Sequence, residues 1–334
     1  LDTFLRPLWA ILVLYLFIVA RVDRRLIWLS LLMGAYVAGL NALYETLVLA
    51  EAGGRVRGIM SPVTYGNLAL LMGFMACLGV DAFQHHRDRY LMVAFGGLGL
   101  ALLASLLSGS RGGWIALPVL IPLLLMLFWQ RGYRRSVYRL ALYLPLLLAV
   151  GLALPQTGVM ARIATAQIEF NNYLADPMQY GDTSVGQRLE LWRAAWDAFK
   201  NAPVLGGGLG HSFNTYLQQG IDAGRYHPAT AVQTMPHNLI LDLLAIRGLV
   251  GLLGVVIMWG CLAWVFIKAR SLADPGARAL GEAGLLLLIG YFLFGLTDSP
   301  MEYGGYISFF CLYTLLAVYA ISESGLRGNA INKN

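Results

Sequence analysis

Nine apolar runs, each of roughly 20 residues, constrain the fold of this chain more than any other feature of its sequence. A helix of that length crosses the roughly 30 Å of hydrocarbon in a bilayer, where every backbone polar group needs a partner within its own segment. The runs are continuous and lack the roughly ten-residue alternation of a transmembrane β-barrel. We therefore predict nine transmembrane helices, over residues 4–20, 26–50, 63–83, 90–109, 113–130, 137–155, 248–267, 279–297 and 303–321.

The composition agrees with an all-α integral membrane protein, a polytopic bundle of transmembrane helices. Of the 334 residues, 58% are hydrophobic and 13% are charged, which is unusual for a soluble domain. The three cysteines all fall inside apolar runs, where they act as small hydrophobic side chains. We divide the chain into N-terminal transmembrane helices (1–155), a loop region with an amphipathic helix (156–236) and C-terminal transmembrane helices (237–334).

The basic residues predict the orientation of these helices. If the 21–25 loop is cytoplasmic, 14 of the 24 lysines and arginines lie on that side, and the alternation holds through every hairpin. The loop at 156–236 is then extracytoplasmic. Topology and lipid headgroups explain the cytoplasmic arginines. The arginines on the outer side need another explanation.

Three outer arginines lie in short loops, Arg55 and Arg57 in GGRVRG and Arg111 in SGSRGGW. The link around Arg111 is so short that we expect Arg111 at the mouth of a tight helical hairpin. The neighbouring glycines let another group approach the backbone closely. The alternative is that Arg111 only reaches toward lipid phosphate.

The outer loop contains one clear helix, SVGQRLELWRAAWDAF, in which Ser184 and Gln187 form a capping-box pattern. Arg188 shares its face of this helix with apolar side chains: Leu189, Trp192, Trp196 and Phe199. The opposite face carries the charged side chains that we expect in solvent: Glu190, Arg193 and Asp197. A guanidinium in apolar surroundings needs an anion or a set of acceptors, so we rank Arg188 above Arg193 as a ligand-binding group.

Several arginines at one membrane surface fit a phosphate or pyrophosphate. The planar guanidinium suits phosphate oxygens, and a pyrophosphate has enough oxygens to engage several arginines at once. The acidic residues on this side are scattered, with no Asp-x-Asp pair, so we expect no metal ion. The stretch VLGGGLGHSF at 204–213 lacks the ending of a phosphate loop and the third glycine of a dinucleotide fingerprint, so we expect a flexible turn.

The stretch PHNLILDLLAIRGLVGLLG places a histidine at the head of a long helix. Thr234 and Pro236 mark the helix start, and His237 lies in the first turn, where the positive end of the helix dipole opposes protonation. A neutral imidazole can accept a proton. The helical pattern is longer than one bilayer requires, so His237 either projects above the lipid or caps a segment that bends near Gly248. A lone histidine at a helix start can also serve only as a structural hydrogen-bond partner.

The sequence His237-Asn238, followed after nine residues by Gly248-Leu249-Val250-Gly251, resembles the histidine motif of the bacterial O-antigen ligases. These are membrane glycosyltransferases that complete lipopolysaccharide. Asn238, Gly248 and Gly251 are the residues that support the motif around the histidine.

The arginine stretches are similar to the same superfamily of ligases and polymerases. In the ligases an arginine motif lies upstream of the histidine, in a large periplasmic loop, and Arg188 in QRLELW occupies the matching place. The family pattern has leucine four residues after that arginine, where this chain has Trp192. The stretches around Arg111 and around Arg55 and Arg57 are similar to the wider superfamily.

The resemblance implies a GT-C-like glycosyltransferase in the bacterial inner membrane, with an active site facing the periplasm. The donor would be an O-antigen glycan on undecaprenyl pyrophosphate and the acceptor the lipid A core oligosaccharide, with membrane lipids around the enzyme. No metal, cofactor, nucleotide sugar or nucleic acid is implied. Members have more transmembrane helices than the nine predicted here, so we expect further helices before Leu1.

The resemblance also implies roles for the singled-out residues. His237 would be the general base that deprotonates the acceptor hydroxyl, with inversion at the anomeric carbon. Arg188 and Arg111 would hold the pyrophosphate and stabilise the charge on the leaving group. The further candidates for the pyrophosphate are Arg55, Arg57 and Arg193.

Three other functions remain open. An O-antigen polymerase or a protein O-oligosaccharyltransferase would use the same donor with a different acceptor. A transporter of the lipid-linked glycan would place ionisable residues near the bilayer midplane and show paired broken helices. The predicted spans hold almost no such residues at mid-depth, and Glu45 and Asp81 lie toward span ends.

Overall fold

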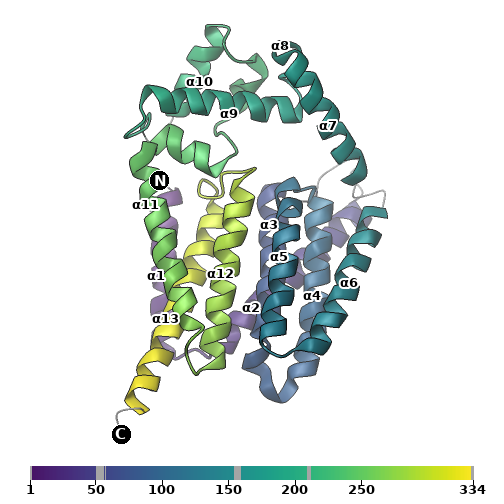
Figure 1. The fold of residues 1–334 in the computed structure, drawn as a ribbon, viewed down its shortest axis with the longest axis vertical. Helices are drawn as coiled ribbons and strands as arrows, with labels where there is room; N and C mark the ends of the chain where they lie inside the picture. The colour runs from purple at the N-terminus through teal and green to yellow at the C-terminus, as the bar shows by residue number, and fades with distance from the viewer. Residues whose placement is uncertain (1, 50–55, 57, 154–158, 209–211, 332–334) are drawn as a thin grey trace. The chain divides into compact units, whose positions relative to one another are not determined.

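The fold is helical throughout the part of the chain that the computed structural model describes, which is residues 2–49, 56, 58–153, 159–208 and 212–331 (Figure 1). Within those ranges the structure has no β-strand. The chain divides into two compact units, which we describe separately. Unit 1 comprises residues 1–157, 261–293 and 301–334, and unit 2 comprises residues 158–260 and 294–300.

Within the described residues, six helical stretches are long and apolar enough to cross a membrane, which confirms a polytopic helical membrane protein. They are Arg25–Leu49, Pro62–Ser108, Gly112–Gln130, Leu239–Ala269, Pro275–Gly295 and Gly304–Gly325. The stretch Pro62–Ser108 contains two of the predicted spans. The predicted spans at 4–20 and 137–155 fall on helices that are not among the six, so as membrane crossings they remain predictions.

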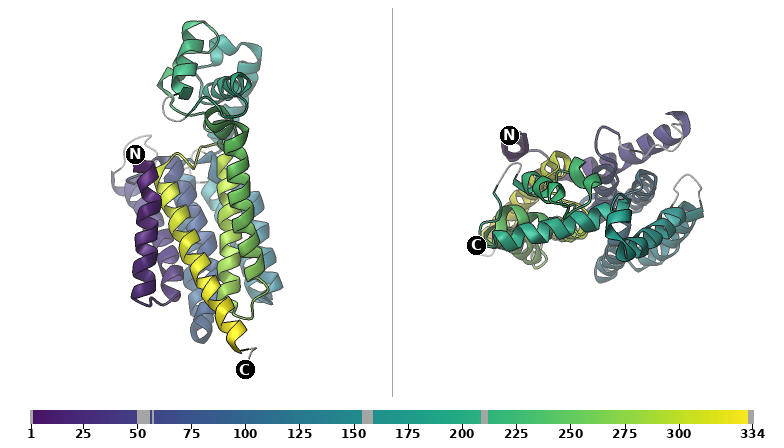
Figure 2. Two further views of the ribbon diagram at one scale, coloured as in Figure 1. Left: turned by 90° about the vertical axis from the view of Figure 1, so that its left-hand side faces the viewer. Right: turned by 90° about the horizontal axis from the view of Figure 1, so that it is seen from above.

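Unit 1 is a bundle of apolar helices. Its elements are α1 (Asp2–Val19), α2 (Arg25–Tyr44), η1 (Glu45–Leu49), α3 (Pro62–Cys77), η2 (Leu78–His86), α4 (Arg87–Ser108), α5 (Arg111–Gln130), α6 (Arg134–Ala153), most of α12 (Pro275–Gly295) and α13 (Gly304–Ile331). Helices α1 and α13, from opposite ends of the sequence, lie side by side (Figure 2). Small residues bring α2, α3 and α4 together: a Cβ on Gly39 would lie 2.3 Å from Cβ of Leu100, and one on Gly73 would lie 2.7 Å from Cβ of Ala101.

A buried ionic cluster lies at the end of α5, around Arg131. From the sequence we expected membrane topology and lipid headgroups to explain this arginine. The Arg131 side chain is only 11% exposed and pairs with Asp81 at 3.2 Å and with Glu282 of α12. Its guanidinium also donates to the carbonyl of Leu78 at 3.0 Å. Arg131 therefore joins three elements of unit 1 and does not serve only as a contact for lipid headgroups.

Unit 2 contains more helices than the one expected in the loop. Its elements are α7 (Val159–Ala175), α8 (Pro177–Tyr180), α9 (Ser184–Asn201), α10 (Ser212–Asp222), η4 (Pro228–Val232) and the first part of α11 (Leu239–Ala269). Their shared core is apolar: Leu191, Ala194, Ala195, Ala198, Phe213, Leu217, Tyr226, Ala245 and Ile246. This core fixes α9 against α10 and against the first turns of α11.

Helix α9 differs in two ways from the prediction. Its N-cap is Thr183, whose hydroxyl accepts from the N–H of Gly186 at 3.0 Å, so the predicted cap at Ser184 is wrong by one residue. The buried face is the one with alanines and Leu191, and Trp196 is 48% exposed. Alanine side chains are small and let the neighbouring elements approach closely. This close packing decides which face of α9 is buried, although the tryptophans would bury a larger apolar area.

Glu190, which we expected in solvent, is instead buried to 1% exposure on that face. Its carboxylate accepts from the Tyr173 hydroxyl at 2.5 Å and from the N–H of His227 at 3.0 Å, which joins α7 to the segment before η4. Burial raises the pKa of Tyr173, and the hydrogen bond to Glu190 raises it further, so the phenol stays a donor. Glu190 is therefore a structural acceptor inside unit 2.

Helix α11 is broken at Gly248, where φ 62° and ψ −161° confirm the bend that was one of the two alternatives for this helix. The glycine-rich stretch, expected to be a flexible turn, is hydrogen-bonded to this break along residues 203–208. The N–H groups of Gly207 and Gly208 donate to the carbonyls of Ala245 and Ile246 at 2.8 and 3.0 Å. In return the N–H groups of residues 249 and 250 donate to the carbonyls of residues 203 and 204. The backbone groups freed by the break therefore find partners in the glycine-rich stretch.

Candidate active site

His237 lies just before α11 and not in its first turn as predicted. Asn238 is the cap: its Oδ1 accepts from the N–H groups of Ile240 and Leu241, both at 3.1 Å. His237 has a left-handed backbone with φ 53°, which is uncommon for a residue other than glycine. The N-terminal end of the helix dipole therefore lies beyond His237 and not around it as predicted.

Both ring nitrogens of His237 meet side chains of unit 2. Nδ1 lies 3.2 Å from Oδ1 of Asp298, and Nε2 lies 3.3 Å from Oε1 of Gln233. The histidine side chain is 23% exposed and the aspartate only 2%. The second carboxylate oxygen of Asp298 is buried with no hydrogen-bond partner in the described part of the chain. A buried carboxylate therefore faces one edge of a partly accessible imidazole.

Asp298 comes from the segment that follows α12, and Asn238 holds that segment in place. The Asn238 amide donates to the carbonyl of Leu296 at 3.2 Å while its oxygen caps α11. Gly295 permits the approach, because a Cβ there would lie 2.8 Å from Cβ of Leu239. The two residues of the motif thus have different roles. His237 faces Asp298, and Asn238 positions the segment that carries Asp298.

Sequence reasoning missed Asp298 as a site residue and counted it only among scattered acids. One signal was available, because Asp298 directly follows a predicted span on the side of the membrane assigned to His237. The two residues are 61 positions apart in the chain, and only the packing of unit 2 brings them together.

Gln233 extends the site toward α9. Its amide nitrogen donates to Oε1 of Gln187 at 3.1 Å, while its own Oε1 faces His237. Arg188, the next residue after Gln187, is partly buried in the first turns of α9. The hydrogen bonds therefore connect the histidine to the turn that carries the predicted pyrophosphate arginine.

Arg193 is held by contacts within unit 2. Its guanidinium lies 3.5 Å from Oε1 of Glu190 and 5.7 Å from the ring centroid of Tyr226. Trp192, the residue that departs from the family pattern, is partly buried on the same helix. His227 caps η4 through Nδ1, which accepts from the N–H of Ala229 at 3.1 Å.

The arginine predicted at a tight hairpin belongs to unit 1. Helix α4 ends at Ser108, Gly109 adopts a left-handed conformation with φ 65°, and α5 begins at Arg111, so the hairpin itself is confirmed. Ser110 is fully buried, and its hydroxyl donates to Oδ1 of Asn67 at 2.6 Å. Asn67 in turn donates to the hydroxyl of Tyr306 at 2.6 Å, which ties the hairpin to α13.

Some predicted site residues lie beyond what the structure describes. The backbone of Arg111 is described as the first residue of α5, whereas its side chain lies outside the described part. Arg55 and Arg57 lie outside the described residues altogether. Among the residues that are described, no three His, Cys, Asp or Glu side chains form a group suited to a metal ion.

The arrangement around His237 suits proton transfer. A carboxylate at Nδ1 favours the imidazole tautomer with its proton on that nitrogen. The lone pair on Nε2 can then accept a proton once a hydroxyl donor replaces the amide oxygen of Gln233, itself an acceptor, in front of it. The same carboxylate stabilises the imidazolium that forms. Gln233 holds a polar group in front of Nε2, at the position a substrate hydroxyl would need.

Comparison with known proteins gives two matches. Residues 96–256 match a family model described as O-antigen ligase. An uncharacterized protein of Haemophilus influenzae is 24% identical over 285 residues, which cover 83% of this chain and 69% of the relative. The family match contains the three residues with a predicted catalytic role, Arg111, Arg188 and His237, and also Arg193. Asp298 lies beyond its end.

Proposed function

Since the chain is a multi-pass membrane member of the O-antigen ligase family, we propose that it transfers an O-antigen glycan from undecaprenyl pyrophosphate to the lipid A core oligosaccharide. The reaction takes place at the periplasmic face of the bacterial inner membrane. The observation that carries this proposal is the pairing of His237 with the buried carboxylate of Asp298 within the family's histidine motif.

His237 acts as the general base through Nε2. The acceptor sugar hydroxyl takes the place of the Gln233 amide in front of this nitrogen and gives up its proton as its oxygen attacks the anomeric carbon. The new bond joins that oxygen to the anomeric carbon, while the bond from the anomeric carbon to the pyrophosphate oxygen breaks. Undecaprenyl pyrophosphate leaves with the electron pair, and attack from the opposite face inverts the anomeric centre.

Asp298 orients the ring and stabilises the imidazolium. Its Oδ1 lies at the Nδ1 edge, so the proton of the neutral ring is held on the nitrogen that does not react. Asn238 keeps the aspartate segment against the start of α11 through its hydrogen bond to Leu296. Asp298 and Asn238 are positioning residues, and His237 is the residue that meets the acceptor hydroxyl.

The arginines bind the pyrophosphate. Arg188 is our first choice, because the hydrogen bonds from Gln187 through Gln233 connect its turn of α9 to His237. Arg111, the first residue of α5, is the second choice and follows by resemblance, as the group that would stabilise the charge growing on the leaving group. Arg55 and Arg57 follow by resemblance. Arg193 is the weakest candidate, since Glu190 and Tyr226 already hold its guanidinium.

Replacing the base tests the mechanism. In proteoliposomes with lipid-linked glycan and lipid A core, His237→Ala should lower the rate of transfer by about 100-fold to 10,000-fold, as expected for loss of a general base. The control is His85→Ala, which removes an exposed histidine of unit 1 and should transfer at the wild-type rate. Transfer by His237→Ala at the wild-type rate would remove the base role.

The choice of acceptor tests the substrate assignment. Wild-type protein is offered the lipid-linked donor with lipid A core, with a second lipid-linked glycan, or with an acceptor protein. Transfer to lipid A core supports the proposal. Transfer only to the lipid-linked glycan would identify a polymerase, and transfer only to the protein would identify a protein O-oligosaccharyltransferase.

A further inference from the structure

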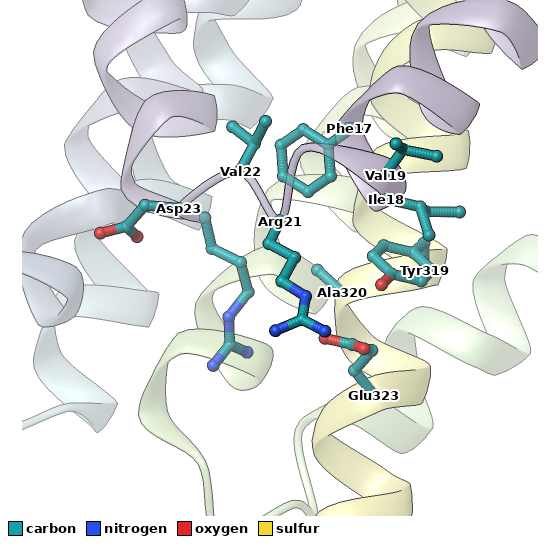
Figure 3. Close-up of a pocket in the computed structure, with 10 residues that line it drawn as sticks. Phe17, Ile18, Val19, Arg21, Val22, Asp23, Tyr319, Ala320 and Glu323 are labelled. Atoms are coloured by element: carbon teal, nitrogen blue, oxygen red, sulfur yellow. The ribbon is translucent and has the colours of Figure 1, made fainter.

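Two cavities in the described part of the chain differ in their lining. The larger, of about 740 Å³, lies in unit 1 between the α1–α2 turn and α13. Figure 3 shows Arg21 directed toward Glu323 across this cavity. The guanidinium of Arg24, which also lines it, donates to Oδ2 of Asp274 at 2.8 Å. The charges of this cavity therefore meet opposite charges within unit 1.

The smaller cavity, of about 360 Å³, lies wholly in unit 2, and none of the described residues that line it is charged. Its volume falls at the lower end of the range for small-ligand sites, which is roughly 300 to 1,000 Å³. Phe213 and Ala245, two members of the apolar core of unit 2, contribute apolar surface to it. The rest of its lining includes amides and hydroxyls: Asn201, Ser212, Thr215, Tyr216 and Gln219.

The amides of this cavity have hydrogen-bonding capacity left for a ligand. Asn201 uses one N–H, which donates to the Tyr216 hydroxyl at 3.1 Å, so its oxygen and its other N–H remain. No hydrogen bond engages the side chain of Gln219 within the described residues. The Ser212 hydroxyl donates to the carbonyl of Gly208 and keeps its lone pairs as acceptors. The cavity therefore offers both donors and acceptors without a net charge.

Tyr216 is held in place before any ligand binds. Asn201 contacts its hydroxyl, and the Arg225 guanidinium lies 5.7 Å from the centroid of its ring. The same guanidinium lies 5.6 Å from the ring centroid of Tyr226, a buried residue of the core of unit 2. A lining that is already ordered reduces the entropy that is lost when a ligand binds.

This chemistry suits an uncharged sugar ring. Each sugar hydroxyl both donates and accepts hydrogen bonds, as the amides and hydroxyls of the cavity require. The apolar surface of Phe213 and Ala245 can contact the C–H groups of the ring. A phosphate or a carboxylate would meet no cation in the described lining, and a metal ion would meet no carboxylate there.

The cavity lies at the opposite end of α9 from the proposed pyrophosphate site. Arg188 lies in the first turns of α9, and Asn201 is its last residue. At about 1.5 Å per residue, the two lie about 20 Å apart along the helix axis. A sugar in the cavity is therefore not the sugar that reacts, and it belongs to a more distant part of an extended glycan.

We propose that this cavity binds a neutral sugar residue of a glycan substrate, several sugars away from the bond that forms. The inference rests on the proposed glycan transfer. Two substrates offer such a sugar, the lipid-linked donor and the lipid A core oligosaccharide, and the cavity fits the chemistry that they share. A contact so far from the reaction strengthens binding of the substrate and of the transition state equally, so it lowers KM and leaves kcat unchanged.

Replacing Gln219 tests the proposal. Transfer is measured in proteoliposomes with donors of one repeat unit or of many, and with the complete core oligosaccharide or one cut back to its inner sugars. Gln219→Ala should raise KM by about threefold to tenfold for the substrate that reaches the cavity, with kcat unchanged. A rise confined to the long donor would place the donor glycan in the cavity. A rise confined to the complete core would place the acceptor there.

The matched control is Gln218→Ala. Gln218 is the neighbouring glutamine of α10, it donates to Asp222 at 2.8 Å, and it does not line the cavity. This variant should keep the KM of wild type for every substrate. Asn201→Ala should raise KM for the same substrate as Gln219→Ala does, because it removes another amide from the same cavity.

A binding measurement separates this inference from the proposed function. Donor glycan released from its lipid, and core oligosaccharide released from lipid A, are each titrated into the full-length protein in detergent by calorimetry. Wild type should bind one of the two about threefold to tenfold more tightly than Gln219→Ala does, whether or not it transfers glycan to lipid A core. The inference is overturned if wild type binds neither glycan, if Gln219→Ala binds both as wild type does, or if Gln218→Ala weakens binding equally.

Discussion

His237 and Arg21 share a left-handed backbone, at φ 53° and φ 50°, and no other residue but glycine does so in the described part of the chain. What holds each of them differs. The His237 ring contacts Asp298 and Gln233, so its conformation is fixed by side chains from separate parts of unit 2. Arg21 is fixed by the backbone hydrogen bonds of a helix end, which any residue could make. The left-handed conformation therefore depends on the side chain at His237 and on the backbone alone at Arg21.

The largest effect is expected for the group that holds His237. Asp298→Asn keeps the shape of the side chain and removes its charge, so the ring loses the partner that orients it and stabilises the imidazolium. We expect kcat for glycan transfer to fall by about 100-fold to 10,000-fold with little change in KM. Initial rates in proteoliposomes measure both constants.

The matched control is Asp222→Asn, which removes an exposed carboxylate of the same unit that accepts from Gln218 at 2.8 Å. It should leave kcat unchanged. An Asp298→Asn protein with the kcat of wild type would show that the contact with His237 serves packing and not proton transfer.

The next effect concerns Gly248, a left-handed position where no side chain fits. Its φ and ψ belong to a region open essentially to glycine alone, and a Cβ would lie 2.4 Å from the carbonyl oxygen of Val204. We expect Gly248→Ala to lower the free energy of unfolding by about 3 kcal/mol or more, from strain together with the clash. Thermal unfolding in detergent gives the change in Tm.

Gly254 provides the control for this variant. It lies in the same helix, and an added Cβ would meet nothing within 4 Å. Gly254→Ala should therefore be neutral or should stabilise the protein by up to about 1 kcal/mol. If both alanines have the same effect on Tm, the break in α11 does not require glycine.

The sequence was sufficient for features that depend on neighbouring residues. The apolar runs fall on helices, the bend at Gly248 is present, and the link before Arg111 is a tight hairpin. Each of these follows from local hydrophobicity or from a residue that only one backbone conformation suits. The predicted start of α11 was too early because we placed Pro236 in the first helical turn, although Asn238 is the stronger N-cap.

Features that depend on tertiary packing were not predictable in the same way. The prediction of which face of α9 is buried was wrong. The helical wheel favoured the face with the large tryptophans, but the small alanines decide how closely the neighbouring helices approach. The partner of His237 could not be chosen from the sequence, since Asp298 is one of several acids and reaches the ring only through the hydrogen bond from Asn238 to Leu296.

Glycine and alanine variants at positions 21 and 237 test whether the side chain or the backbone holds each left-handed conformation. At both positions glycine should give a protein more stable than alanine by about 1 kcal/mol, because only glycine avoids the left-handed penalty. Relative to wild type, the two glycine variants should change Tm in opposite directions. In lipid-free detergent Arg21→Gly should raise Tm, whereas His237→Gly should lower it, because the ring contacts with Asp298 and Gln233 are lost. A rise in Tm for His237→Gly would show that those contacts add nothing to stability.

The smallest effect is expected from Asp274, which anchors Arg24, the residue before α2, through an ion pair at 2.8 Å. Burial alone would raise the pKa of this carboxyl, but hydrogen bonds from Ser324, Arg24 and the N–H of Gly276 lower it below the usual 3.8. A folded-state pKa below the unfolded one stabilises the protein above the unfolded pKa, and this contribution is lost as pH falls through the folded pKa. Wild type should therefore have a higher Tm than Asp274→Asn at neutral pH, and the gap should close as the pH is lowered below about 4. A gap in Tm that stays constant down to pH values below both pKa values would show that Asp274 acts through its shape and not through its charge.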